Sequence, residues 1–131
     1  MSTPLVTYGD VEQALLDHLT ARLAGHPLAA GLQTGTQIPD SPDVFLLVRR
    51  AGGLRERYLD RPRLDVQVWH CTDVDAHDLA DLVSGLIWQA EGVGPIRGVT
   101  DATGPVYVPD SDRGASRYLL TVTLTVKGAP A

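Results

Sequence analysis

The feature that most constrains the fold is an apolar stripe at helical spacing, because a helix with one apolar face must be covered by another element. Its members are Leu79, Leu82, Val83, Leu86, Ile87 and Ala90. Thr72 and Asp75 have the spacing of a capping box before the stripe, and Gly92 follows it. A second stripe predicts an earlier helix over residues 8–24, with Thr7 and Asp10 as a weaker capping box. That stripe consists of Val11, Leu15, Leu16, Leu19 and Leu23.

Short apolar runs and period-two alternation predict strands in the rest of the chain. They cover residues 32–38, 44–48, 64–69, 96–103, 106–108 and 118–126. The order α-β-β-β-α-β-β predicts an α+β fold, with a mostly antiparallel four- or five-stranded sheet and two helices packed on one face. A length of 131 residues suits one domain, residues 1–131, in which residues 128–131 are expected to form a frayed tail.

Charge and cysteine content exclude several classes of function. The net charge of −5 argues against a dedicated nucleic-acid binder, which would carry a basic excess. Cys71 is the single cysteine, so neither an internal disulfide nor a multi-cysteine zinc site is possible, and a lone thiol of this kind is expected to be buried. Without an apolar run of roughly 20 residues or a signal-like start, the chain is expected in the cytoplasm.

The densest polar cluster, residues 70–78, could be interpreted as a metal site because it contains His, Cys and Asp. Helix capping explains it better, since its acids lie where a helix N-terminus favours them. His70 and Cys71 would point to opposite faces of a strand and cannot form a nucleophile–base pair. No serine lies on a strand-to-helix elbow, and no glycine pattern predicts a phosphate site. We therefore expect no enzyme, no metal and no cofactor.

Six of the eleven basic residues lie within residues 49–63, between two predicted strands. Arg and Tyr are enriched in protein interfaces, so a protein–protein interface is predicted there; a solvated hairpin loop and a DNA contact remain alternatives. The predicted interface comprises Arg49, Arg50, Arg55, Arg57, Tyr58, Arg61 and Arg63. A complementary acidic surface would suit a head-to-tail ring. The predicted acidic residues are Asp73, Asp75, Asp110 and Asp112.

A succession of motifs along nearly the whole chain resembles one protein family. A helix opens with Gly9-Asp10-Val11-Glu12, and a strand ends in the Arg-Arg-x-Gly-Gly of residues 49–53. The Arg-Pro-Arg-Leu-Asp-Val of residues 61–66 and the Gly-Pro-x-x-x-Pro of residues 104–109 follow. In this order and spacing the motifs resemble the tail terminator (tail completion) proteins of long-tailed phages that infect actinobacteria.

The resemblance implies a structural subunit of the virion, assembled in the host cytoplasm. A hexameric ring would cap the head-proximal end of the tail tube, stop its polymerisation and present the surface on which the filled head docks. Its partners would be the tail tube protein and a neck or head-completion protein, while DNA passes through the ring without specific binding and no membrane is involved. A neck or head-completion connector, an unrelated cytoplasmic ligand-binding domain and a nucleic-acid-binding module remain alternatives.

Overall fold

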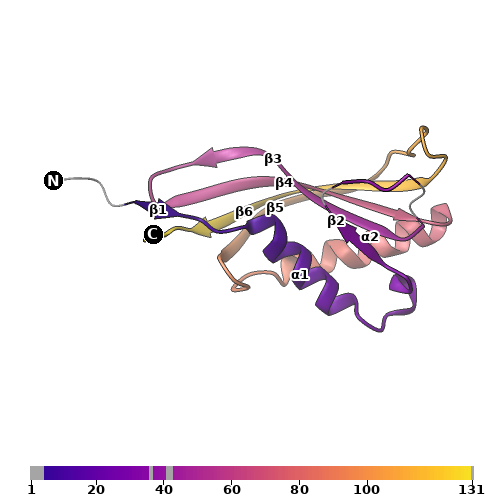
Figure 1. Cartoon of the computed structure of the whole chain (residues 1–131), viewed down its shortest axis with the longest axis horizontal. Helices are drawn as coiled ribbons and strands as arrows, with labels where there is room; N and C mark the ends of the chain where they lie inside the picture. Colours follow the sequence, from indigo (N-terminus) through magenta and orange to yellow (C-terminus); the bar gives the residue numbers. More distant parts are fainter. Residues whose placement is uncertain (1–4, 36, 41–42, 131) are drawn as a thin grey trace.

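Two helices lie on one face of a five-stranded sheet in the computed structural model, which describes residues 5–35, 37–40 and 43–130 (Figure 1). The helices are α1 (Val11–Leu23) and α2 (Asp73–Trp88), with a short 3-10 turn at Pro27–Ala29. The strands of the sheet are β2 (Gln33–Gly35), β3 (Phe45–Arg55), β4 (Leu59–His70), β5 (Ile96–Tyr107) and β6 (Ser116–Lys127). They are ordered β2-β3-β4-β6-β5, and every pair is antiparallel except β2 with β3. The predicted α+β class and element order are confirmed.

The two helices begin at side-chain caps. The Thr72 hydroxyl accepts a hydrogen bond from the backbone N–H of Asp75 at 3.1 Å, as the capping-box spacing predicts. Helix α1 is capped by Asp10, whose carboxylate accepts from the N–H of Gln13 at 3.0 Å. The helix begins at Val11, three residues after the predicted start, and the cap is Asp10 rather than Thr7, which belongs to a short strand.

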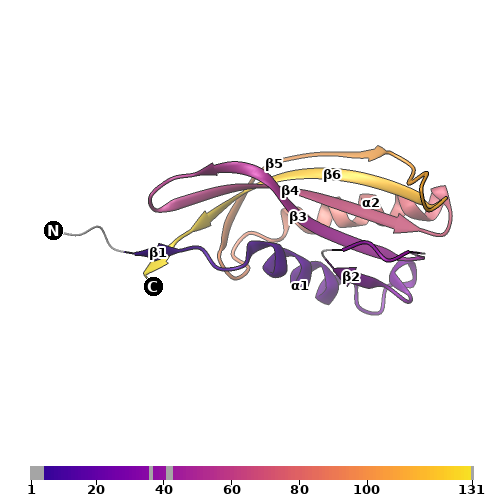
Figure 2. The ribbon, with the colours of Figure 1, turned by 45° about the horizontal axis from the view of Figure 1, so that its top comes forward.

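The main core lies between the helices and the facing side of the sheet (Figure 2). Alternate residues of the three long central strands supply this side: Leu46, Val48, Leu64, Val66, Val68, Leu120, Val122, Leu124 and Val126. The apolar stripes of α1 and α2 cover them, which is why both helices pack on the same face.

Among the residues that the structure describes, a second apolar cluster covers one end of the opposite face of the sheet. It is formed by Phe45, Leu47 and Trp69, and Ile38 and Ala115 pack against it. The rings of Phe45 and Trp69 meet edge to face, with centroids 5.5 Å apart. Toward the other end the face carries the half-buried threonines of β6, and it is polar.

Strands β3 and β4 form a long hairpin that extends beyond the helices (Figure 1). The expectation that the strands stop at Val48 and resume at Leu64 is wrong, because pairing continues to Arg55 and Asp60. A bulge between Arg50 and Gly52 absorbs the irregular sequence. Gly53 has φ +103°, and a Cβ there would lie 2.1 Å from the carbonyl oxygen of Arg61, so only glycine fits. The glycine pair therefore bends a strand and does not end it.

The two ends of the chain pair with each other. Strands β1 (Val6–Thr7) and β7 (Ala129–Pro130) form a separate antiparallel two-stranded sheet beside the hairpin tip (Figure 1). The prediction that residues 128–131 fray is therefore wrong for residues 129 and 130, while residue 131 lies outside the described part. Residues 96–107, predicted as two strands, form one strand with a cis peptide bond at Gly104–Pro105.

Candidate functional site

One buried carboxylate holds the arginine-rich hairpin. Asp60 is 1% exposed and accepts two hydrogen bonds from Arg50, at 2.5 and 2.8 Å, in a bidentate pair. Arg55 donates to the same carboxylate at 2.9 Å. Because Arg55 and Asp60 are opposite each other near the tip and Arg50 lies by the bulge, one acid fixes both parts of the hairpin. The sequence reasoning missed Asp60; an acid alternating with arginines across two strands is the signal that could have found it.

Tyr8, which directly follows β1, fastens the tip of the hairpin. Its hydroxyl donates to the carbonyl oxygens of Glu56 and Arg57, at 2.7 and 2.9 Å. The Arg55 guanidinium lies over its ring, 4.6 Å from the centroid. The N–H of Gly128 donates to the carbonyl oxygen of Tyr58 at 3.1 Å. The tip is therefore attached to both termini, so that it is held in a fixed orientation.

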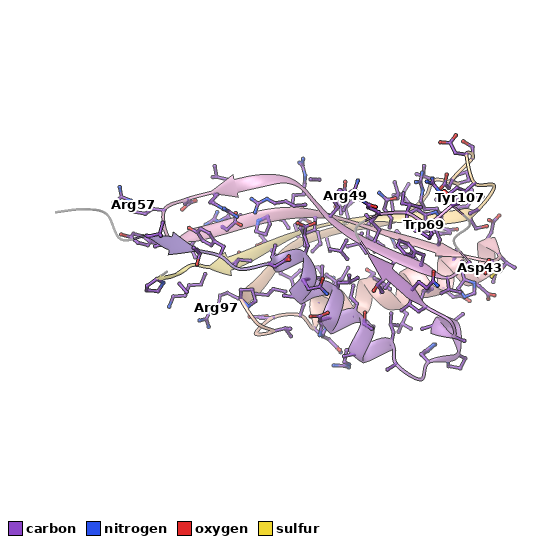
Figure 3. All side chains as sticks on the ribbon, viewed as in Figure 1. Asp43, Arg49, Arg57, Trp69, Arg97 and Tyr107 are labelled. Atoms are coloured by element: carbon purple, nitrogen blue, oxygen red, sulfur yellow. The ribbon has the colours of Figure 1, made fainter. Side chains whose placement is uncertain are left out.

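The predicted interface residues divide into two groups. Arg50 and Arg55 bind Asp60, and Arg63 donates to the carbonyl oxygen of Ala51 at 3.2 Å, so these three support the hairpin itself. The remaining four are exposed, with Arg49 opposite Asp65 on β4 (Figure 3). They are Arg49, Arg57, Tyr58 and Arg61. Arg55 and Arg63 are exposed as well, so a partner can reach all the predicted interface residues except the largely buried Arg50.

The predicted acidic residues lie at the end of the molecule away from Arg57, where Figure 3 places Trp69 and Tyr107. Asp110 is buried and accepts from the Trp69 indole at 3.1 Å and from Arg113 at 3.2 Å. Asp110 therefore stabilises the fold and is not available for contact with a neighbouring subunit. Asp112 is exposed.

Asp73 and Asp75 lie in the first turn of α2. Asp73 is exposed and accepts from the hydroxyls of Tyr107, at 3.2 Å, and Ser116. Asp75 is half-buried, with an oxygen 3.9 Å from Nδ1 of His70. Of the predicted acidic residues, Asp73 and Asp112 are therefore exposed and Asp75 is partly exposed.

The two buried carboxylates have lowered pKa values. Burial alone would raise the pKa of Asp60, but hydrogen bonds from Arg50 and Arg55 outweigh it and hold the pKa below the usual value. Burial opposes ionisation of Asp110 in the same way, and the bonds from Trp69 and Arg113 lower its pKa. Both groups are therefore ionised in the folded protein near neutral pH.

This arrangement predicts loss of stability in acid. A carboxyl with a lowered pKa in the folded state stabilises the fold above its unfolded pKa of about 3.9, and that contribution disappears as pH falls through the folded value. Asp110→Asn, which keeps an oxygen acceptor for Trp69, should show a smaller drop in unfolding free energy between pH 5 and pH 2 than the parent chain. Urea unfolding across that range measures it, and identical pH profiles for the two proteins would contradict the prediction.

The polar cluster at residues 70–78 does not gather ligands or a catalytic pair. Cys71 is exposed, so the expectation of a buried thiol is wrong; it follows the last residue of β4, at a turn and not in the core. The imidazole of His70 is engaged by the backbone: Nδ1 accepts from the N–H of Cys71 at 2.8 Å, and Nε2 lies 3.0 Å from the carbonyl oxygen of Leu28. Across the described ranges, no three His, Cys, Asp or Glu side chains are grouped to hold a metal ion.

No helix in the described part of the chain is long and apolar enough to cross a membrane.

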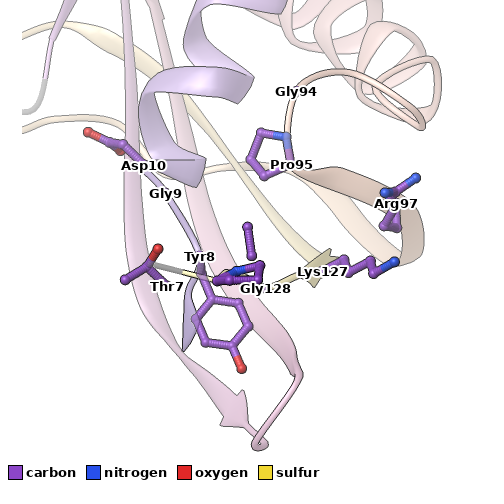
Figure 4. Close-up of a pocket in the computed structure, with 11 residues that line it drawn as sticks. Thr7, Tyr8, Gly9, Asp10, Gly94, Pro95, Arg97, Lys127 and Gly128 are labelled. Carbon is purple, nitrogen blue, oxygen red and sulfur yellow. The ribbon is translucent and has the colours of Figure 1, made fainter. Parts of the chain in front are cut away.

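An open pocket of about 580 Å³ lies where β1 and β7 meet the start of α1 (Figure 4). Tyr8, Asp10, Arg97 and Lys127 line it together with glycine and proline residues. Within the described part of the chain, neither Arg97 nor Lys127 forms an ion pair. The pocket adds two exposed cations to the hairpin end of the molecule.

Comparisons with known proteins assign no family. No protein-family model matches the chain, and no curated protein matches it. Among solved structures, the gp17 protein of bacteriophage SPP1 is similar, with a TM-score of 0.49 and 16% sequence identity over 88% of this chain and 91% of that chain. At this identity and TM-score the similarity assigns no role to the chain.

Proposed function

We propose that this chain is a non-enzymatic structural protein of a long-tailed phage, in which it is the tail terminator. Copies would form a ring, hexameric in the related proteins, that caps the head-proximal end of the tail tube. The ring would stop polymerisation of the tube and provide the surface on which the head docks. Its contacts would be with its own copies, with the tail tube protein and with a neck or head-completion protein.

The observation that carries the proposal is the rigid arginine hairpin at one end of a molecule whose other end is acidic. A closed ring of identical subunits needs two different, complementary surfaces on each copy. Asp60 and Tyr8 hold the hairpin in one orientation, so little conformational entropy is lost when it binds. Arg57 and Arg61 on one copy and acidic side chains at the opposite end of another, Asp75 among them, would then be the charged contacts.

The motifs that carry the family resemblance occupy demanding positions in the fold. Gly53 of Arg-Arg-x-Gly-Gly lies in the hairpin, where no Cβ fits. Gly104 of Gly-Pro-x-x-x-Pro has φ +104°, and a Cβ there would lie 2.7 Å from the carbonyl oxygen of Leu119. Both motifs therefore place glycine where the backbone of this fold leaves no room for a side chain. A protein with the same fold would need glycine at these positions, which supports the resemblance on which the proposed tail function rests. The net charge of −5 suits a channel through which DNA slides without specific binding.

Alanine at Arg57, Tyr58 and Arg61 together tests the proposal. All three side chains are exposed and none binds Asp60, so each change should alter the unfolding free energy by about 0.5 kcal/mol or less. Phage supplied only with this variant should produce tails longer than normal that lack heads. Electron microscopy of the lysates measures tail length and head attachment.

Arg22→Ala, at an exposed position near the end of α1, is the matched control and should give normal particles. Normal infectious particles from the triple variant would contradict the proposal. Tails of normal length that remain separate from filled heads would instead identify a neck connector.

A further inference from the structure

Several exposed apolar side chains lie at the two ends that the proposed ring would join. Leu54 and Tyr58 at the hairpin tip are 65% and 53% exposed. At the opposite end Val74, in the first turn of α2, is 69% exposed, and Tyr107, near the end of β5, is 45% exposed. Exposed aromatic and aliphatic residues within a polar surround mark interaction sites.

The hairpin tip combines these apolar groups with positive charge. Leu54 lies opposite Arg61 across the two strands, and Arg57 and Tyr58 form the turn. The contacts from Tyr8 to the turn backbone leave the Tyr58 and Arg57 side chains outside the fold, as Figure 3 shows for Arg57. The tip therefore presents the exposed apolar side chains of Leu54 and Tyr58 beside exposed arginines, with a single exposed acid, Glu56, in the turn.

The opposite end combines apolar groups with negative charge. Tyr107 packs on Tyr118 with ring centroids 5.2 Å apart, and His77 packs on the same Tyr118 ring at 5.5 Å. The Tyr107 hydroxyl donates to Asp73, which ties the end of β5 to the start of α2 beside Val74. Asp75 and Asp78 continue the acidic surround along the helix. This surface, called here the Tyr107 patch, is held in place before any partner arrives.

We propose that the hairpin tip of one copy docks on the Tyr107 patch of a second copy, with Leu54 and Tyr58 against Val74 and Tyr107. This inference rests on the proposed ring and names the two surfaces that form it. Arg57 and Arg61 then meet Asp75 and Asp78 of the second copy at the rim of the contact. The hairpin tip cannot dock on the Tyr107 patch of its own chain, because the two surfaces are at opposite ends of the molecule.

Docking through side chains suits this fold better than pairing of a strand of the second copy with the edge of the sheet. The free edge strand β5 contains three irregularities of register and Pro105 within its length. Such features discourage backbone pairing at an edge. A second copy is therefore expected to bind through the projecting tip, whose side chains are exposed.

The test uses two variants of the whole chain, each with one surface altered. The tip variant carries Leu54→Glu and Tyr58→Ala; the patch variant carries Val74→Arg and Tyr107→Ala. The parent chain should associate with rising concentration, and each variant alone should remain a monomer, with association weakened at least about 10-fold. An equimolar mixture should form a dimer of twice the 14.0 kDa monomer mass and nothing larger, since one intact tip meets one intact patch. Sedimentation analysis measures these masses.

Trp88→Ala removes an exposed apolar side chain outside both surfaces and should assemble like the parent. Where Tyr107→Ala disturbs folding, Val74→Arg alone replaces the patch variant, because Val74 points to solvent. A mixture that stays monomeric, a variant that assembles alone, or a parent chain monomeric up to about 1 mM would overturn the contact. Abnormal tails from the tip variant together with any of these results would leave the tail function standing and assign the tip to the tube protein.

Discussion

Replacing Trp69 with alanine is expected to lower the free energy of unfolding by about 3–5 kcal/mol. The side chain is 0% exposed and fills the second cluster, between Phe45 and the segment that contains Ala115. Its indole N–H also binds the buried Asp110, so the substitution opens a cavity and removes a partner from a buried charge. Urea unfolding followed by circular dichroism measures the loss.

The other tryptophan provides the control. Trp88 ends α2 and is 51% exposed, so Trp88→Ala should cost about 0.5 kcal/mol or less. Equal losses of unfolding free energy for the two substitutions would contradict the interpretation of the cluster around Trp69 as a second core. Trp69→Phe should recover part of the volume without the bond to Asp110, which separates packing from hydrogen bonding.

Asp60→Ala is expected to lower the unfolding free energy by about 2–4 kcal/mol, because it leaves Arg50 and Arg55 without their buried partner. This expected loss of unfolding free energy is smaller than that usual for breaking a fully buried ion pair, because the side chains of both arginines are partly exposed to solvent. The loss should be concentrated in the hairpin. Hydrogen exchange of the backbone amide of Glu56, which donates to the carbonyl oxygen of Leu59 at 2.7 Å, should become faster than exchange in the helices.

Asp65→Ala is the matched control on the same strand. Asp65 is partly exposed opposite Arg49, so its removal should cost about 1 kcal/mol or less. If Asp60→Ala and Asp65→Ala had the same effect, the hairpin would not depend on its buried carboxylate. The oligomeric state of Asp60→Ala can be measured in the same samples and should be lower if the fixed tip makes the subunit contact.

The α+β class could be predicted because its signals are local. The helical stripes of α1 and α2 and the alternation in β6 each lie within one segment, and the Thr72 cap needs only three residues of spacing. The hairpin could not be predicted in this way. Its order depends on Tyr8 bonding to the Glu56 backbone, 48 residues away, and on a glycine bulge that has the composition of a loop.

The charges of the candidate site can be read from the sequence, whereas the structure that carries them cannot. Arginine clustering indicated an interface at residues 49–63, yet nothing local distinguishes Arg50, which binds Asp60 within the hairpin, from Arg57, which a partner can reach. Asp110 was predicted as part of an acidic surface, whereas it is buried and accepts a hydrogen bond from Trp69, 41 residues earlier in the chain. Isolated exposed residues such as Leu54 and Tyr107 have no sequence pattern, so the folded chain alone brings them to opposite ends.

Pairing of β1 with β7 has a practical consequence for labelling. Val6 lies opposite Pro130, and the N–H of Gly128 donates to the carbonyl oxygen of Tyr58, so a fluorophore attached to either of these two strands lies close to the turn that contains Tyr58. Such an attachment would report on whatever approaches the tip, and a bulky one would obstruct it. The turn at Asp112 and Gly114 lies at the far end of the sheet and is the natural place for the second dye of an energy-transfer pair, or for new termini in a circularly permuted chain.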